Sequence, residues 1–378
     1  MPEQPIYLDH NATTPLDPRV ADAMAPFLRD HFGNPSSSHA AGRRAREAVE
    51  RARAQVADLL GAEPDEIVFT SGGSESDNMA VFGVAEARRE RGRHLVTSAV
   101  EHPAVLEPCR VLERRGWELA VLPVDGRGRV DPEVLAQALR PDTVLVSLMH
   151  ANNEVGTLQP VRSAAEACRA RGVWLHTDAA QSVGKVPVRV DDLGVDLLTL
   201  AGHKLYGPKG VGALYIRRGR GIARFLHGAG HEAGRRAGTE NVLAIVGLGE
   251  AARLAGMHLQ DGMARSRALR DRLLGALRAR LGELPAHGDL VDGLPNTLSV
   301  ALPGVRAADL LRDLGDLVAA SPGAACHADG VVASSVLAAM KVPADLAAGT
   351  VRFSVGRFTT EDEVDRAAAL VAAAVRDG

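Results

Sequence analysis

Short apolar runs rich in Val, Leu and Ile alternate with longer Ala/Arg/Glu segments of helical period between about residues 20 and 246. This alternation is typical of a mostly parallel sheet with helices on its faces, so we expect an α/β fold. An apolar stripe along residues 43–60 predicts a covering helix, which Gly61 ends. The predicted strands are residues 66–70, 94–98, 143–149, 173–177, 196–200 and 212–216.

The pattern changes after Gly247. A long Ala/Leu/Arg stretch predicts helical structure over residues 248–281, and further strands are expected at residues 296–302 and 351–355, before a terminal helix from Glu361. A chain of 378 residues is longer than one hydrophobic core usually serves. We therefore expect a second, smaller domain in the carboxyl-terminal part.

Charge and cysteine content exclude several classes of function. Acidic and basic residues are interspersed and give a formal net charge of -3, so we expect no nucleic-acid or membrane partner. Cys109, Cys168 and Cys326 lie far apart without CxxC spacing, which argues against a disulfide framework and against a metal site. We find neither a secretory leader pattern nor a run of roughly 18 apolar residues. The expected location is cytoplasmic.

Unusual residues follow the predicted strands, at the edge where open α/β sheets bind ligands. The first cluster is Thr-Ser-Gly-Gly-Ser-Glu-Ser-Asp-Asn at residues 70–78. Its glycines and the helix start behind them favour a phosphate. The cluster does not match the P-loop or dinucleotide-binding patterns, and an ordinary glycine turn capped by Ser74 also explains it.

Two further clusters each supply one charged group. Asp178 ends a strand, with Gln181 nearby, so its carboxylate can pair with a cationic ring nitrogen or merely cap the next helix. Lys204 follows the next strand, where burial would lower the pKa of its amine and make it reactive toward an aldehyde. Lys209 in the same turn has the pattern of a solvated charge. A lysine, an acid and an anion site together are the set that pyridoxal phosphate requires.

Ordered motifs along almost the whole chain carry a family resemblance. They are LDHNATTP, GNPSS, FTSGGSESDN, EHPAV, HANNEVG, HTDAAQSVGK, GHKLYGPKGVGALY, GTEN, LPNT, GAACH and RFSVGRFTT. With these motifs the chain resembles the cysteine desulfurases of class-V aminotransferase fold and their near relatives, the selenocysteine lyases. The resemblance implies the type I fold of pyridoxal phosphate-dependent transferases. It also implies a large cofactor-binding domain at residues 15–257, with a mostly parallel sheet, and a small α+β domain at residues 1–14 and 258–378.

The resemblance implies roles for single residues. Lys204 would form the Schiff base with pyridoxal phosphate, Asp178 would pair with the pyridine nitrogen, and Gln181 would donate to the phenolic oxygen. The other cofactor contacts would be His102 stacked on the ring, Asn153 beside ring and substrate, Gly73, Ser74 and His203 at the phosphate, and Thr239 from the second subunit of a homodimer. Arg352 would bind the substrate carboxylate through parallel hydrogen bonds, although a salt bridge would also explain it. Ala201 stands where many desulfurases have a phosphate-binding serine.

Cys326 lies in the small-residue segment 321–330, which is suited to a mobile loop, whereas Cys109 and Cys168 fall within helical patterns. The resemblance implies that the Cys326 thiolate takes the substrate's sulfur or selenium, assisted by His327 or by the substrate itself. The amine of the Schiff-base lysine would move the α proton, and His102 is a further candidate proton carrier.

We therefore expect a cysteine desulfurase that converts L-cysteine to L-alanine. Persulfide sulfur would pass from Cys326 to an acceptor protein for iron–sulfur cluster or other sulfur-compound biosynthesis. GAACH resembles the loop of selenocysteine lyases, so release of selenide from L-selenocysteine is an open alternative, whereas Pro103 and the loop length after Cys326 favour the desulfurase. An aminotransferase or β-lyase would share the lysine and the aspartate but need no loop cysteine. A non-enzymatic sulfur carrier would lack the cofactor.

Overall fold

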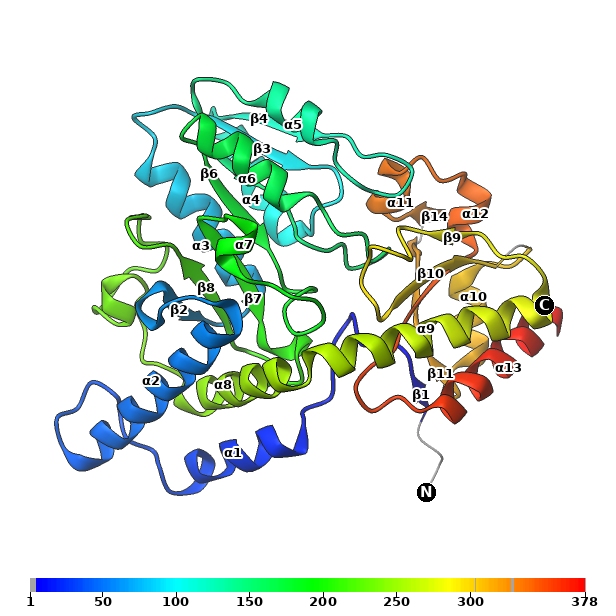
Figure 1. Cartoon of the computed structure of the whole chain (residues 1–378), viewed down its shortest axis with the longest axis horizontal. Coiled ribbons are helices and arrows are strands. Elements are labelled where there is room, and N and C mark those ends of the chain that lie inside the picture. The colour runs from blue at the N-terminus through cyan, green and yellow to red at the C-terminus, as the bar shows by residue number, and fades with distance from the viewer. Residues whose placement is uncertain (1–4, 303, 328–329, 378) are drawn as a thin grey trace.

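A seven-stranded sheet forms the centre of the computed structural model, which describes residues 5–302, 304–327 and 330–377 without the side chains of residues 324–333. Its strand order is β2-β8-β7-β6-β5-β3-β4 (Figure 1). These strands are β2 (Ile67–Thr70), β3 (His94–Ser98), β4 (Glu118–Leu122), β5 (Thr143–Ser147), β6 (Trp174–Asp178), β7 (Leu197–Ala201) and β8 (Gly212–Ile216). Within this sheet β8 runs antiparallel to both neighbours and the other adjacent strands are parallel. The predicted α/β fold with a mostly parallel sheet is confirmed.

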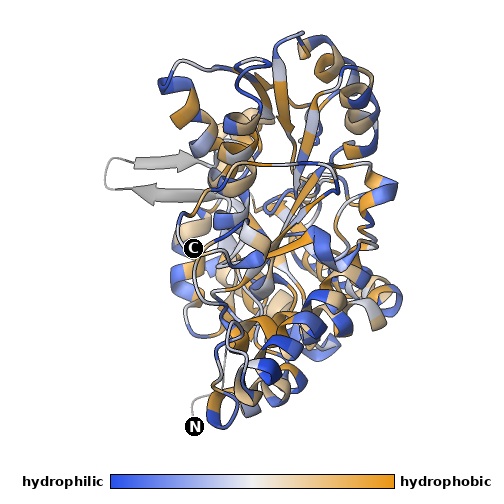
Figure 2. Ribbon diagram, turned by 90° about the vertical axis from the view of Figure 1, so that its left-hand side faces the viewer, coloured by the Kyte–Doolittle hydropathy of each residue, from blue (hydrophilic) through white to orange (hydrophobic). Residues whose placement is uncertain are grey.

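Helices cover both faces of this sheet, which is why β5, β7 and β8 are buried at every position (Figure 2). One face packs with α2 (Ala40–Leu60) and α8 (Val242–Met257), the other with α3 (Gly73–Ala87) and α4 (Pro103–Arg114). The predicted stripe faces the core in α2, which Gly61 ends in a left-handed conformation with φ of 66°. The other helices of this part are α1 (Pro18–Arg29), α5 (Pro132–Ala138), α6 (Val161–Ala170) and α7 (Val190–Leu193).

A separate hydrophobic cluster surrounds an antiparallel sheet of order β12-β15-β10-β9. Ile6 and Leu8 join this cluster, because β1 pairs with β11 at its side. Its elements are β1 (Ile6–Tyr7), β9 (Ala286–His287), β10 (Thr297–Ala301), β11 (Val318–Ala319), β12 (Ser321–Pro322), β15 (Thr350–Ser354), α9 (Leu259–Leu281), α10 (Ala307–Leu314) and α13 (Glu361–Asp377). Two short helices, α11 (Ser335–Ala339) and α12 (Ala344–Ala348), complete the described elements of this part. The domain limits at residues 15 and 258 stay a prediction.

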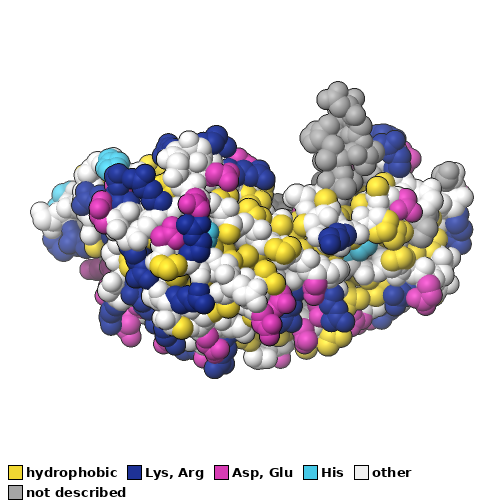
Figure 3. Space-filling view, turned by 90° about the horizontal axis from the view of Figure 1, so that it is seen from above, with side chains coloured by type: hydrophobic (Ala, Val, Ile, Leu, Met, Phe, Trp, Pro, Cys, Tyr) yellow, Lys and Arg dark blue, Asp and Glu magenta, His cyan; other side chains and the backbone are white. Residues whose placement is uncertain are grey.

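The helical stretch predicted over residues 248–281 is two helices, α8 and α9, bent by 76° at His258. The sequence shows no break there because the apolar period continues, but α8 packs on the large sheet and α9 on the small one. Among the described residues, no single helix is long and apolar enough to cross a membrane, and α8 with α9 meets that test only as a bent pair. Acidic and basic side chains are mixed over the face seen in Figure 3.

The segment around Cys326, which was predicted to suit a mobile loop, is a strand over part of its length, and its mobility stays a prediction. Residues Ala324–His327 form β13, which pairs antiparallel with β14 (Gly330–Ala333) and sets Cys326 opposite Val331. Backbone pairing needs no large side chain, so a segment of Ala, Gly and Val can form such a ribbon even though its composition suggests a loop. The side chain of Cys326 lies outside the described residues.

Candidate active site

A cavity of about 380 Å³ lies at the carboxyl ends of the parallel strands. Its lining includes residues that end or follow β2, β3, β5, β6 and β7, and one residue, Arg352, from the small sheet. The predicted residues that line it are Gly73, Ser74, His102, Asn153, Asp178, Gln181, His203, Lys204 and Arg352. The structure therefore brings these side chains together around one space. Thr239 is exposed and does not line this cavity.

Lys204 follows β7 in a short 3₁₀ turn, and its amine is held by main-chain oxygens. Nζ donates to the carbonyls of Asn11 at 2.6 Å and Ala12 at 2.8 Å. Burial and the nearby Arg352 guanidinium lower the pKa of Lys204 to about 8, and Asp178 counteracts this shift in part. A substantial fraction of the amine is thus neutral near pH 7.5, as a nucleophile requires.

Asp178 ends β6 and is buried, with one oxygen accepting from the Ala180 N–H at 2.9 Å. Burial raises the pKa of Asp178, while His102 and Lys204 oppose this shift. The sequence did not single out two further buried carboxyls nearby, Asp77 and Glu101. A cationic group in the cavity would favour the ionised forms of these carboxyls.

The two neighbouring acids differ in their hydrogen bonding. Oδ1 of Asp77 has no hydrogen-bond partner among the described residues, and burial raises its pKa well above the usual range. Glu101 accepts from the Ser98 hydroxyl at 2.6 Å and from the Met149 N–H at 2.9 Å. Burial raises the pKa of Glu101 to about 8. Both follow predicted strands, so the rule that located Asp178 could also have located them.

The predicted phosphate cradle is the amino terminus of α3. Gly72 caps this helix with φ of 150°, a conformation that other residues rarely adopt, and it offers no side chain that would cover the free N–H groups. Gly73 needs no such conformation, and a Cβ there would lie 3.5 Å from the Ala201 Cβ, an ordinary contact. Gly72 is therefore the residue whose backbone demands glycine. Glu75 in the first turn is neutralised by Arg236 at 2.7 Å.

Two histidines flank the cradle. His102 caps α4, where its Nδ1 accepts from the Ala104 N–H at 3.1 Å while the residue remains exposed. Burial and the charge of Lys204 lower the pKa of His203 to about 4, so this ring is neutral at pH 7. Its Nδ1 lies 3.1 Å from the Thr13 hydroxyl. A neutral ring held at Nδ1 leaves Nε2 available to a ligand.

Asn11 and Lys185 are residues that the sequence reasoning missed. Nε2 of Gln181 donates to the Asn11 carbonyl at 2.8 Å, and Lys185 Nζ donates to Gln181 Oε1 at 2.8 Å. Lys185 also lies 3.4 Å from Asn11 Oδ1. The motifs LDHNATTP and HTDAAQSVGK contain these residues, but nothing in either motif shows that they meet.

Arg352 enters the cavity from β15 with one ion pair already formed. It donates to Asp9 at 2.7 Å, to the Ser321 hydroxyl at 2.8 Å and to the Asn153 carbonyl at 3.1 Å. Its Nε has no partner among the described residues. The salt bridge considered as an alternative therefore exists, and the guanidinium keeps a buried Nε–H without a partner among the described residues.

The other two cysteines are buried in helices, as their sequence patterns predict. Cys109 lies in α4 and Cys168 in α6, and burial raises the pKa of each thiol to about 12. Neither is a thiolate at neutral pH. Cys326 stays the cysteine that is predicted to react as a thiolate.

Known proteins resemble this chain over most of its length. The aminotransferase class-V family matches residues 6–367. The chain is 48% identical to cysteine desulfurase IscS of Dictyoglomus turgidum, over 95% of this chain and 92% of that protein. It is 49% identical to cysteine desulfurase IscS of Klebsiella pneumoniae, over 97% and 92%. A solved NifS-like protein superposes with a TM-score of 0.93 at 38% identity, over 100% of both chains.

Proposed function

The chain belongs to the class-V aminotransferase family, and from that membership and the cavity around Lys204 we propose that it is a pyridoxal phosphate-dependent cysteine desulfurase. The observation that carries the proposal is the meeting of Lys204 and Asp178 in one cavity beside a bare helix amino terminus. L-cysteine would be converted to L-alanine, and the sulfur would serve iron–sulfur cluster or other sulfur-compound biosynthesis.

The residues present fit pyridoxal phosphate. A cavity of about 380 Å³ suits a ligand of this size. The free N–H groups after Gly72 suit a phosphate, and the buried Asp178 carboxyl suits a protonated pyridine nitrogen. We assign attachment to Lys204, the ring nitrogen to Asp178, the phosphate to the α3 terminus with Ser74 and His203, the phenolic oxygen to Gln181, and the ring face to His102. When bound, the cofactor supplies an aldehyde for amines and a ring that accepts the electrons freed at the substrate α carbon.

Lys204 and Arg352 have separate tasks in this proposal. The lowered pKa of Lys204 lets its amine take a proton from the substrate α carbon and hold it as an ammonium against the Asn11 and Ala12 carbonyls. Arg352, which lines the cavity beside Asn153, binds the substrate carboxylate through its guanidinium and orients it. His102 stays a second candidate for moving a proton.

Cys326 is the proposed sulfur acceptor. Its thiolate attacks the substrate sulfur, so an S–S bond forms as the carbon–sulfur bond breaks, and the electron pair of the broken bond takes up a proton. One cysteine thiol and one substrate thiol become one persulfide and L-alanine, so no external oxidant is needed. A partner copy that brings Thr239 to the phosphate, and an acceptor protein that takes the persulfide, complete the proposal.

A Cys326→Ser variant tests the proposed function directly. We expect normal cofactor absorbance, loss of alanine formation from L-cysteine by about 100-fold or more, and no persulfide labelled on the chain. A variant that desulfurates L-cysteine at the parental rate would remove Cys326 from the reaction. Selenide release from L-selenocysteine, compared in both proteins, decides between desulfurase and selenocysteine lyase, and transamination of a keto acid would favour an aminotransferase.

A further inference from the structure

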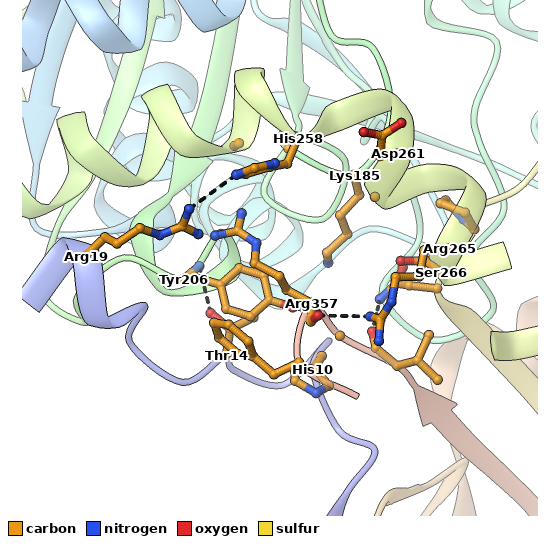
Figure 4. A pocket seen from close by; sticks show the side chains of 18 residues that line it. His10, Thr14, Arg19, Lys185, Tyr206, His258, Asp261, Arg265, Ser266 and Arg357 are labelled. Atoms are coloured by element: carbon orange, nitrogen blue, oxygen red, sulfur yellow. Dashed lines mark hydrogen bonds between the residues drawn. The ribbon is translucent and has the colours of Figure 1, made fainter. Parts of the chain in front are cut away.

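A second cavity, of about 350 Å³, lies beneath the bend between α8 and α9 (Figure 4). Lys185 lines this second cavity, while its hydrogen-bond partners Asn11 and Gln181 line the first. Asn296 also faces the second cavity and donates to Asn11 Oδ1 at 3.0 Å. The two cavities are thus separated by a thin polar wall that these side chains form.

Cations outnumber acids in the second cavity. Its lining contains Arg19, Lys185, Arg265 and Arg357 but one carboxylate, Asp261. Asp17, behind this lining, pairs with Arg19 at 2.8 Å and Arg357 at 2.7 Å. Arg265 donates to the main-chain oxygens of Arg357 and Thr359. The cavity keeps an excess of positive charge after these pairs are counted.

Lys185 is the least compensated of these cations. Its hydrogen bonds go to neutral amide oxygens, and among the described residues it forms no ion pair. Burial and the neighbouring charges of Lys204 and Arg352 lower its pKa well below the usual range. An anion in the second cavity would offset both the lost hydration and this repulsion.

The rest of the lining indicates the body of the ligand. Tyr206 and Phe358 meet edge to face at 5.6 Å, and Ala255, Pro295 and Val355 add apolar surface. His10 is buried there, its Nδ1 has no partner among the described residues, and burial lowers its pKa to about 4. A neutral imidazole nitrogen provides one hydrogen bond without further charge. This combination suits an apolar body with a single anionic head.

The hydrogen bonds within the wall connect occupancy of the second cavity to the hydrogen bonding of the first. Because Lys185 donates to Oε1 of Gln181, the amide nitrogen of Gln181 is directed toward the Asn11 carbonyl, on the side of the first cavity. If Lys185 turned to an anion in the second cavity, the Gln181 amide would lose this restraint and could present either its N–H or its oxygen. The hydrogen bonding of the first cavity would then change.

We propose that the second cavity binds a small organic carboxylate with an apolar body, and that Lys185 couples its occupancy to the Gln181 amide of the first cavity. Benzoate is the probe. It is titrated by calorimetry into the purified chain with its cofactor, at an ionic strength held constant with chloride. We expect one saturable site per chain, weakened about tenfold or more by Lys185→Met, since a charge-assisted bond is lost.

Three further variants define where benzoate binds. Lys341→Met, at an exposed lysine outside both cavities, should leave the affinity unchanged. Ser266→Phe fills the second cavity without removing a charge, so it should abolish benzoate binding. This variant tests the site independently of Lys185→Met, whose result would be uninformative if that variant folded poorly. Arg352→Ala should leave binding intact. Absence of a saturable site, or binding lost in Arg352→Ala but kept in Lys185→Met, would overturn the proposal.

The coupling between the two cavities is measured separately, through the absorbance of the cofactor, and this measurement rests on the proposed function. Benzoate should shift the visible absorbance of the bound cofactor in the parental chain and not in Lys185→Met. A saturated second cavity with no change in absorbance would overturn the coupling. A purified chain without any cofactor absorbance would contradict the proposed function instead, and calorimetry would still decide whether the second cavity binds the anion.

Discussion

The two cavities each hold a lysine whose pKa is lowered, but they hold it differently. Lys204 donates to the main-chain carbonyls of Asn11 and Ala12, whereas Lys185 donates to side-chain oxygens of Gln181 and Asn11. Main-chain acceptors stay where the fold places them, while amide side chains rotate and present either of two groups. Fixed acceptors suit an amine that must meet one atom of a ligand. Rotating acceptors suit an amine whose partners change.

The acids around the two cavities also differ, in whether arginines neutralise them. Asp17, near the second cavity, is neutralised by two arginines, which hold its pKa well below the usual range. Asp77 and Asp178, at the first cavity, are buried and form no ion pair with an arginine among the described residues. The first cavity is therefore prepared for a cationic ligand group and the second for an anionic one.

Replacing each lysine in turn is the strongest test of whether Lys204 and Lys185 have different roles. Lys204→Ala should lower alanine formation from L-cysteine by about 1000-fold or more, because attachment and proton transfer are both lost. Lys185→Met should keep the cofactor attached and lower the rate by less than about tenfold. Borohydride reduction followed by peptide mapping identifies the attached lysine. A label on Lys185, or equal losses in both variants, would contradict the assignment.

Asp178→Asn separates the chemical role of this acid from its structural role. Loss of the charge that faces the ring nitrogen should lower the rate about 100-fold. The cofactor-free chain should be as stable as before or more stable at pH 7.5, because the raised pKa of Asp178 shows that its ionised form is unfavourable when buried. Urea unfolding of the cofactor-free chain provides the measurement, with the exposed Asp22→Asn as control. A clear fall in stability would mean that Asp178 mainly supports the fold.

Glu101→Gln should produce the smallest effect, on the pH dependence of stability. Burial raises the pKa of Glu101 from 4.5 to about 8, so between these values the folded chain holds one proton more than the unfolded chain. The free energy of unfolding therefore falls as the pH rises through this window. Glu101→Gln should reduce that fall between pH 5.5 and 8 by on the order of 1–3 kcal/mol. Urea unfolding at both pH values measures it, with the exposed Glu113→Gln as control. Identical pH dependence in all three chains would show that Glu101 is ionised throughout.

Most strands that carry the site were predictable because central parallel strands are continuous apolar runs. β3 and β8 have the predicted bounds, and β6 and β7 are shifted by one residue. β4, Glu118–Leu122, was missed although its last four residues are an apolar run, and it lies at the edge of the sheet. The bend at His258 was missed because helix period carries no information on which sheet each half covers.

The site was predictable where a side chain ends a strand, as with Asp178 and Lys204. The contribution of Asn11 was not, because its carbonyl lies 193 positions from the lysine that it holds. Gly72 and Gly73 look identical in sequence, and only the φ of 150° shows which of them the backbone needs. The roles of all the site residues, Cys326 and Thr239 included, stay predictions.

The pairing of β1 with β11 determines when the first cavity can close during synthesis. Ile6 lies beside Val318, Asp9 binds Arg352, and the Asn11 N–H donates to the Ser354 hydroxyl at 2.9 Å. The ribosome makes residues 6–11 before their partners, which follow more than 300 residues later along the chain. The large sheet can therefore fold with Lys204 in place before Asn11 has taken its position beside that lysine. A nascent chain that stops before β15 would expose this amine to any aldehyde in solution.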